Sequence, residues 1–140
     1  MQIVDANVLL YSVNPSSPHH ERAHAWLVNA LSGLEAVGLA WAALLTFIRI
    51  GTSRGAFPRP LTVEEACGYV ERWLAQPNAL VVSPTPRHLA VVRSLLQEAG
   101  SGGNLVSDVH LAALALEHGA EIVSFDRDFQ RFAGLRSFVP

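Results

Sequence analysis

The pattern of apolar and polar positions predicts short strands that alternate with amphipathic helices. Runs rich in Ile and Val predict strands, and apolar residues at a spacing of three to four predict helices. The expected strands cover residues 3–4, 37–41, 79–82, 121–125 and, at one edge, 137–139. The expected helices cover residues 18–32 and 42–52, a segment opened by Thr62, a segment opened by Thr85 and Pro86, and a last segment ended by Gly119.

This alternation predicts an α/β fold, because parallel strands need crossover helices that cover both faces of the sheet. We therefore expect a three-layer α/β/α arrangement around a central parallel sheet, with right-handed crossovers. At 140 residues, without an internal repeat or a long linker, the chain is expected to form one domain over residues 1–140.

Two of the predicted helices have a core face that the spacing defines. In the helix opened by the Thr62–Glu65 capping box, we expect Cys67 to lie in the core beside four apolar residues: Val63, Ala66, Val70 and Leu74. In the helix after Thr85, the expected buried residues are Leu89, Val92, Leu96 and Ala99.

Composition and charge narrow the classes of function. The formal net charge is −2, so the chain has no global attraction for nucleic acid. All ten basic residues are arginine, which excludes mechanisms that need a lysine. Cys67 is the only cysteine, and the apolar run 36–50 is too short to cross a bilayer. A strand is predicted at the very start of the sequence, so we expect no signal peptide. We expect a cytoplasmic protein with no membrane partner.

Carboxylates follow two of the predicted strands, and a third begins the last long helix. Asp5 and Asp126 come after apolar strands, and parallel strands deliver their ends to one edge of a sheet. Asp108 joins them from its helix, with Asp128 close behind Asp126. Because converging carboxylates repel one another, they predict a site for a hard cation, Mg²⁺ or Mn²⁺.

Each acid also has a purely structural interpretation. Asp108 could cap its helix, Asp126 could be a turn residue, and Asp128 could cap a short helix at residues 129–132. Asp5 directly after a buried strand is harder to explain in that way. Asn7 fits equally well as a turn residue or as a donor that orients Asp5.

Three segments together resemble a family. The runs 5–10 (DANVLL), 103–113 (GNLVSDVHLAA) and 124–129 (SFDRDF) are similar to PIN-domain ribonucleases, and more narrowly to VapC toxins of bacterial toxin–antitoxin pairs. The likeness runs essentially end to end. It implies a PIN-like fold and a metal-dependent endoribonuclease that cleaves RNA phosphodiesters, with tRNA or rRNA as the substrate. It also implies a VapB-like antitoxin and a homodimer as partners.

The resemblance assigns roles to the acids. Asp5, Asp108 and Asp126 match the metal-binding residues of the family, with Mg²⁺ or Mn²⁺ as the cofactor, and Asp128 matches a further catalytic acid. Thr46 stands where the family usually carries a glutamate. That departure leaves the number of metal ions open, and it keeps an alternative function: a weakened module that binds RNA or antitoxin.

The arginines and histidines give weaker indications of function. Four arginines are candidate phosphate contacts, although a solvated surface position is the simpler interpretation of each: Arg49, Arg54, Arg59 and Arg127. His110 lies two residues past Asp108, an offset that points a helical side chain elsewhere, so we expect no catalytic role for it. His19, His20 and His24 cluster on one helix, where we expect a solvated face.

Overall fold

The computed structural model describes residues 1–140 and contains one five-stranded sheet, in the order β3-β2-β1-β4-β5. All neighbouring strands are parallel. The strands are β1 Gln2–Val4, β2 Val37–Ala40, β3 Ala79–Val82, β4 Glu121–Val123 and β5 Arg136–Phe138. The strand order places β1 and β4 side by side at the centre, so the residues that follow them emerge at the same edge.

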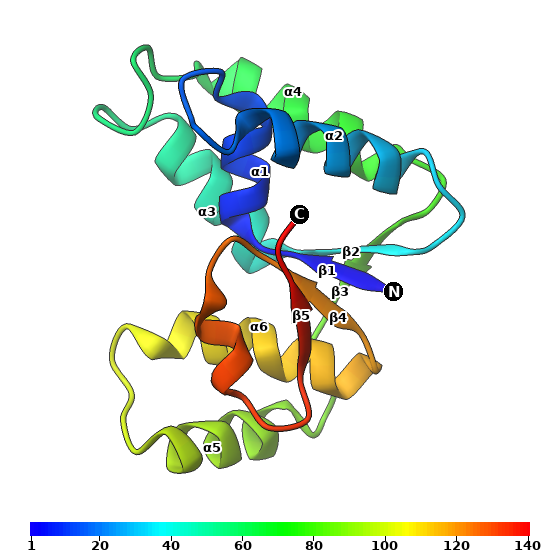
Figure 1. Ribbon diagram of the computed structural model, residues 1–140, viewed down its shortest axis with the longest axis vertical. Coiled ribbons are helices and arrows are strands. Elements are labelled where there is room, and N and C mark those ends of the chain that lie inside the picture. The colour runs from blue at the N-terminus through cyan, green and yellow to red at the C-terminus, as the bar shows by residue number, and fades with distance from the viewer.

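Helices cover both faces of the sheet (Figure 1). Their bounds are α1 Ala6–Val13, α2 His20–Leu31, α3 Trp41–Gly51, α4 Val63–Leu74, α5 His88–Ala99 and α6 Leu105–His118, with a 3₁₀ helix η1 at Arg127–Arg131. In Figure 1, α1 to α4 lie on one side of the strands and α5 and α6 on the other. The predicted three-layer α/β/α fold with a central parallel sheet is confirmed.

Each face of the sheet has its own apolar core. The core on the α1–α4 side includes Phe47 and Trp73, and the core on the α5–α6 side includes the middle of α6 and Phe129. Residues 111–115 of α6 are all buried, so the middle of this helix is enclosed on nearly every side. Its C-cap Gly119 has a left-handed φ of 60°, as expected for a helix end at a glycine.

The segment after β1 is a helix that the sequence analysis did not assign. Residues 6–13 form α1, of which Ala6, Val8, Leu9, Leu10 and Ser12 are buried. A run apolar on nearly every side carries no clear period, so its pattern does not separate a strand from a buried helix. The tertiary packing of α1 between α2 and α3 decides the matter.

The predicted core faces of α4 and α5 were partly wrong. In α4, Trp73 is buried, whereas Val63 is 63% exposed and Cys67 is only half-buried. In α5, Leu95 is the buried residue and Leu89 is 68% exposed. The α5 face is rotated because its first residue, His88, turns toward α6 and forms polar contacts there, which apolar spacing alone does not reveal.

No helix of the structure combines the length and the apolar character that a bilayer crossing requires.

Candidate active site

A cavity of about 490 Å³ opens at the carboxyl edge of the sheet, between α1, α3 and α6. Its polar lining residues are Asp5, Thr46, Arg49, Ser107, Asp108 and His110. Two of the four acids selected from the sequence, Asp5 and Asp108, therefore face one space although 103 positions separate them in the chain. This is the position outside the strand ends where open α/β sheets bind ligands.

Asp5 is held in a fixed orientation by two polar side chains. Its Oδ2 accepts hydrogen bonds from Ser124 Oγ at 2.6 Å and from Asn7 Nδ2 at 2.8 Å. Asn7 Nδ2 also donates to Ser124 Oγ, and Asn7 Oδ1 accepts from the Phe125 backbone N–H. Asn7 thus orients Asp5, which decides between its two sequence interpretations. Asp5 is the N-cap residue of α1, but its side chain makes no capping hydrogen bond to the helix.

Burial and neighbouring charge raise the pKa of Asp5 above its ordinary value. Removal from water is the largest cause, and the charge of Asp126 adds to it, while the hydrogen bond from Ser124 acts in the opposite direction. A cation placed beside this carboxylate would stabilise its ionised form. The structure therefore keeps an acid at the base of the cavity whose ionised form is disfavoured without a counter-charge.

Asp108 shows the same behaviour from the other wall of the cavity. Its pKa is raised first by burial and then by the charges of Asp126, Asp5 and Asp128. The helix α6 begins at Leu105 with Asn104 as its N-cap residue, so Asp108 lies inside the first turn and is not the cap. Its interpretation as a helix cap is wrong, and the helix N-terminus favours an anion at this position.

Asp126 and Asp128 lie nearby but do not line the cavity. Asp126 Oδ1 accepts from the Asp128 backbone N–H at 2.8 Å, and Asp126 is the N-cap of η1, a role that the sequence analysis gave to Asp128. Asp128 is paired with Arg131 at 3.3 Å and is exposed. No three His, Cys, Asp or Glu side chains are grouped closely enough to hold a metal ion by themselves.

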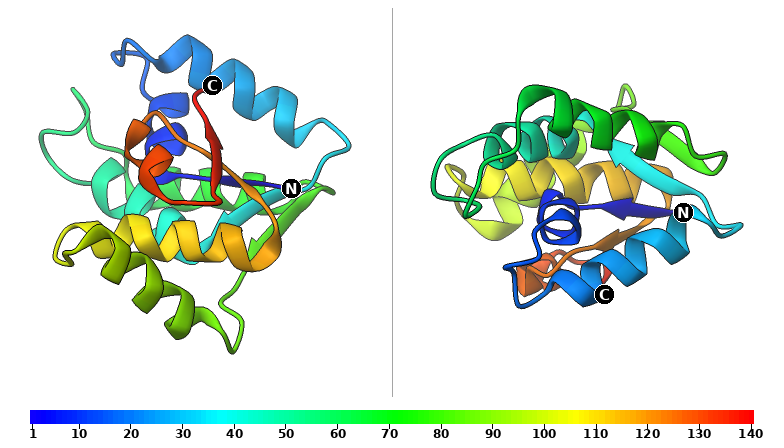
Figure 2. Two further views of the ribbon diagram at one scale, coloured as in Figure 1. Left: turned by 60° about the horizontal axis from the view of Figure 1, so that its bottom comes forward. Right: turned by 90° about the horizontal axis from the view of Figure 1, so that it is seen from above.

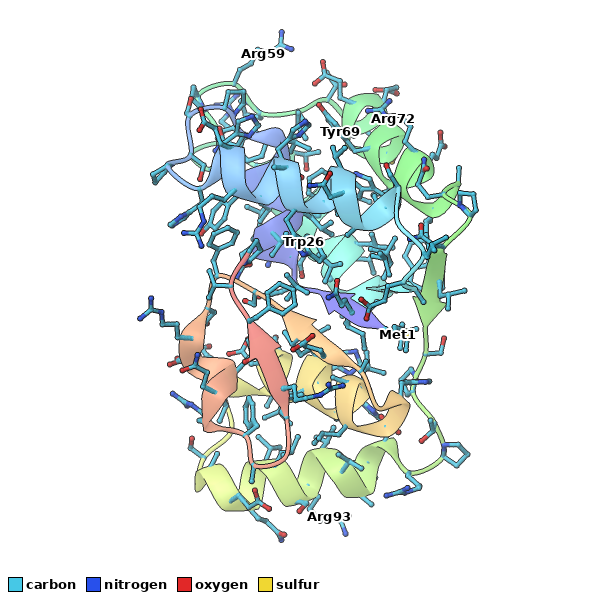
Figure 3. All side chains as sticks on the ribbon, turned by 45° about the vertical axis from the view of Figure 1, so that its right-hand side comes forward. Met1, Trp26, Arg59, Tyr69, Arg72 and Arg93 are labelled. Carbon is cyan, nitrogen blue, oxygen red and sulfur yellow. The ribbon has the colours of Figure 1, made fainter.

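The arginines selected from the sequence lie in different places. Arg49 lines the cavity from α3, one helical turn past Thr46, which lines it too. Arg59 pairs with Glu65 and extends outward from the loop before α4 (Figure 3). Arg54 belongs to that same loop and Arg127 to η1, and neither lines the cavity. Of the four, Arg49 is the one whose position faces the acids.

Ser124 and His110 are site residues that the sequence analysis missed or misplaced. Ser124 is 2% exposed and contacts Asp5, Asn7 and the Asp126 backbone N–H. Its position in the sequence, directly before Phe125 and Asp126, could have indicated that Ser124 belongs to the site. His110 lines the cavity together with Asp108, so the expectation that its helix offset points it elsewhere is wrong.

The histidines of α2 and the turn before it are not a uniformly solvated face. His20 and His24 donate through Nδ1 to the backbone carbonyls of Tyr11 and Ser12, and His19 packs on Phe125 with ring centroids 4.6 Å apart. These contacts tie the turn and α2 to α1 and to the segment after β4. They serve packing in the structure.

Comparison with known families agrees with this fold. The family model of the PIN domain matches residues 3–135. The chain is 55% identical over 136 residues to Ribonuclease VapC37 of Mycobacterium tuberculosis, covering 97% of this chain and 94% of that protein. Ribonuclease VapC33 of the same species is 44% identical over 97% of the chain. The chain belongs to the VapC ribonucleases of the PIN domain family.

A solved structure shares the fold. The crystal structure of Mycobacterium tuberculosis VapC20, described as a sarcin-ricin loop cleaving toxin, superposes with a TM-score of 0.74 at 17% identity, over the full length of both chains. The expected PIN-like fold, and the expected enzyme class of a VapC-type ribonuclease of toxin–antitoxin systems, are therefore confirmed.

Proposed function

We propose that this chain acts as one domain, a divalent-metal-dependent endoribonuclease whose active site is the 490 Å³ cavity. The observation that carries the proposal is the meeting of Asp5 and Asp108, from distant parts of the sequence, in one cavity where each has a raised pKa. Asp126 and Asp128 act on Asp108 through their charge, and Asp126 also acts on Asp5. Raised carboxylate pKa values in a cleft are typical of functional sites.

The donor set fits Mg²⁺ or Mn²⁺. The lining offers carboxylate oxygens and the Thr46 hydroxyl and contains no thiol, which suits a hard cation that keeps several waters. Asp5 and Asp108 would hold the ion, with Asp126 as the third carboxylate. When bound, such an ion activates water and stabilises negative charge on a phosphoryl oxygen.

The chain's own residues supply the remaining tasks. Ser124 and Asn7 keep one oxygen of Asp5 engaged and so fix the direction of the other. Arg49 offers a guanidinium group to an RNA phosphate at the wall of the cavity, where it offsets the repulsion between the acids and the RNA backbone. Transfer RNA and ribosomal RNA are the substrates that we propose to test first.

An RNA cleavage assay tests this function. Purified protein is incubated with total tRNA and rRNA in Mg²⁺ or Mn²⁺, with and without EDTA, beside the variants Asp5→Ala and Arg59→Ala. We expect cleavage by the wild type that EDTA and Asp5→Ala abolish, while Arg59→Ala, on the outer loop, keeps it. Equal activity of wild type and Asp5→Ala would refute the assignment.

We also propose a VapB-like antitoxin as the partner. The crystal structure of Rickettsia felis VapBC2 bound to promoter DNA superposes with a TM-score of 0.67 at 14% identity, and its description is of a toxin–antitoxin complex. This chain has a second cavity of about 410 Å³ between α1, α2 and α4, lined by Leu27, Val28 and Trp73 among others. Figure 2 shows α2 and α4 on either side of α1. Co-purification with a VapB-like protein is the test, and its failure would count against this partner.

A homodimer is the second proposed assembly. The exposed apolar residues Trp41 and Leu45 lie one turn apart on α3, and Leu80 and Val81 are exposed on the edge strand β3. Exposed apolar patches of this kind mark protein contacts. Light scattering should give twice the monomer mass, and a monomer at all concentrations would refute the dimer.

Thr46 favours one alternative function. A threonine in the cavity lacks the charge of a carboxylate, so the site carries less negative charge for a second metal ion. A weakened module that binds RNA or antitoxin is distinguished by the same cleavage assay with Thr46→Glu. If the wild type is inactive and Thr46→Glu cleaves RNA, the alternative is correct.

A further inference from the structure

An aromatic cluster adjoins the residues of the acid site. It consists of Tyr11 on α1, His19 in the turn before α2 and Phe125 in the segment after β4. The ring centroids of these three side chains are 4.6, 5.2 and 5.3 Å apart. Figure 2 shows the turn before α2 close to the segment that follows β4. Three parts of the chain that are distant in sequence therefore bring their rings together at one place.

The aromatic cluster is connected to the residue that orients Asp5. The backbone N–H of Phe125 donates to Asn7 Oδ1 at 3.1 Å, and Asn7 Nδ2 donates to Asp5 Oδ2 at 2.8 Å. Tyr11 follows Asn7 by one turn of α1, so both side chains lie on the same face of that helix. The rings thus begin where the acid site ends. An RNA strand with a phosphate at the acids would pass beside them.

Packing explains only part of the aromatic cluster. The rings hold the turn before α2 against the edge of the sheet, yet each of the three residues is only partly buried. By contrast, the aromatic pair of Phe47 and Trp73 is buried in the core. Solvent therefore reaches the aromatic cluster at the edge of the sheet that carries the acids. Rings in such a position offer a surface on which the bases of single-stranded RNA stack.

Arg22 shows that a planar group can approach this surface from the solvent. Its guanidinium carbon lies over the Phe125 ring, 5.7 Å from the ring centroid. Arg22 is exposed, and its side chain donates a hydrogen bond to the Pro140 carbonyl. Because that contact is exposed, water can replace it, and the side chain can move to admit a base beneath the guanidinium. Aromatic rings and guanidinium planes both stack on RNA bases.

We propose that an unpaired RNA base inserts between the Phe125 ring and the Arg22 guanidinium, next to the acids that bind the ion. The proposal deepens the proposed function and depends on it for the identity of the ligand. Phe125 and Arg22 contact the base, while Tyr11 and His19 hold the Phe125 ring in place. Every base has a face that can stack, whereas a base in a duplex is not available. The cluster therefore selects single-stranded RNA over paired RNA.

Binding of RNA without cleavage tests the proposal. A short fluorescein-labelled oligoadenylate and an abasic chain with the same number of phosphates are each titrated in EDTA, and anisotropy gives the Kd. The ratio of the two Kd values isolates the contribution of the bases, because the phosphates are the same. We expect the wild type to bind the oligoadenylate roughly tenfold more tightly than the abasic chain, as the stacking of one base implies.

Phe125→Leu removes the ring but keeps an apolar side chain in its place. We expect this variant to bind the oligoadenylate roughly tenfold more weakly than the wild type does, with an unchanged Kd for the abasic chain. Phe138→Leu is the matched control, because Phe138 is also partly buried and packs on another aromatic residue, Trp26, with ring centroids 6.2 Å apart. The control should keep the wild-type ratio. Circular dichroism checks that both variants are folded.

Arg22→Lys separates stacking from charge at an exposed position, where the fold is not at risk. Lysine keeps the positive charge but has no planar group to cover a base. We expect Arg22→Lys to weaken binding of the oligoadenylate and to leave the Kd of the abasic chain unchanged. A purely electrostatic role of Arg22 would leave both Kd values as they are in the wild type.

Two results would overturn the proposal: a wild type that binds the oligoadenylate no more tightly than the abasic chain, or a folded Phe125→Leu or Arg22→Lys protein that keeps the wild-type ratio. Because binding is measured without metal, its outcome is independent of cleavage. A ratio that depends on Phe125 and Arg22 in a protein that cleaves no RNA with Mg²⁺ would support the base site and refute the proposed nuclease. Cleavage by a wild type whose ratio depends on neither residue would do the reverse.

Discussion

At the scale of the residue, the small side chain of Ser124 takes part in three hydrogen bonds of the site. Its hydroxyl donates to Asp5 Oδ2 and accepts from Asn7 Nδ2 and from the Asp126 backbone N–H, all within 2.9 Å. One side chain therefore links the acid of β1 with the acid after β4. Residues that orient metal-binding groups in this way matter nearly as much as the ligands.

Replacing this hydroxyl should loosen Asp5 without removing any carboxylate. We expect Ser124→Ala to lower the affinity for Mn²⁺ and the rate of RNA cleavage by roughly 10- to 100-fold. Ser12→Ala is a matched control, because Ser12 is also buried but bonds only the Leu9 carbonyl. Calorimetric titration and an RNA cleavage assay measure the two effects. A Ser124→Ala protein that matches the Ser12→Ala protein in both would show that Asp5 needs no support.

The raised pKa of Asp108 has a consequence for stability. Because the ionised form is disfavoured in the folded state, the unfolded chain releases this proton more readily. The contribution of Asp108 to the stability of the metal-free protein is therefore fully present below the ordinary Asp pKa of 3.8, and it is lost as the pH rises through the higher folded-state pKa. Asp108→Asn removes this dependence.

We expect metal-free Asp108→Asn to melt a few degrees above the wild type at neutral pH, with the difference vanishing near pH 3.8. Added Mg²⁺ should raise the Tm of the wild type but not that of the variant. Thermal unfolding followed by circular dichroism across the pH range measures both. A variant that is less stable than the wild type at neutral pH without metal would contradict this account of the site.

At the scale of the element, apolar spacing was sufficient for the five strands but not for every helix. Strand positions follow directly from short β-branched runs, so β1 to β5 were all expected. The helix α1 was not predicted because it is buried on most sides and therefore has no clear apolar period. The buried face of α5 was predicted wrongly because His88 turns toward Glu117. Long-range polar pairing leaves no periodic trace in a sequence.

The same limit applies to the candidate site. The sequence predicted that Asp5 follows a strand, and in the structure it lies at the end of β1. Because β1 pairs with β4 in a parallel sheet, the ends of these two strands lie together. Local sequence did not reveal that the side chain of Asp126 would cap η1, nor that His110 would share a cavity with Asp108. Those facts depend on side-chain directions that only the packed molecule determines.

The pairing of β2 with its neighbours gives a prediction for packing. A Cβ at Gly38 would lie 2.8 Å from side-chain carbons of both Ile3 and Val82, which are buried on the adjoining strands. We expect Gly38→Ala to destabilise the protein by about 1–3 kcal/mol through overpacking. Gly68→Ala, inside α4 with only the flexible end of Arg72 near it, should be neutral or slightly stabilising. Chemical denaturation measures both, and equal effects would contradict the packing described for the sheet.

At the scale of the whole molecule, attraction for RNA must be local because the formal net charge is −2. Arg49 is the basic residue in the cavity, while Arg59 is paired with Glu65 on the outer loop. We expect RNA binding to weaken steeply with salt, and Arg49→Ala to reduce the slope of log Kd against log salt by about 1, unlike Arg59→Ala. Anisotropy titrations over a salt series measure the slope. A Kd of the wild type for RNA that does not change with salt would show that phosphate contacts do not drive binding.

Asp5 and Asp108, which are 103 positions apart in the chain, are proposed to bind one divalent ion. Isothermal titration of Mn²⁺ or Mg²⁺ into the wild type, Asp5→Asn, Asp108→Asn and the control Glu98→Gln tests this proposal most directly. We expect uptake of the ion by the wild type and by Glu98→Gln, and no uptake by either aspartate variant. No uptake by the wild type, or equal uptake by all four proteins, would contradict it.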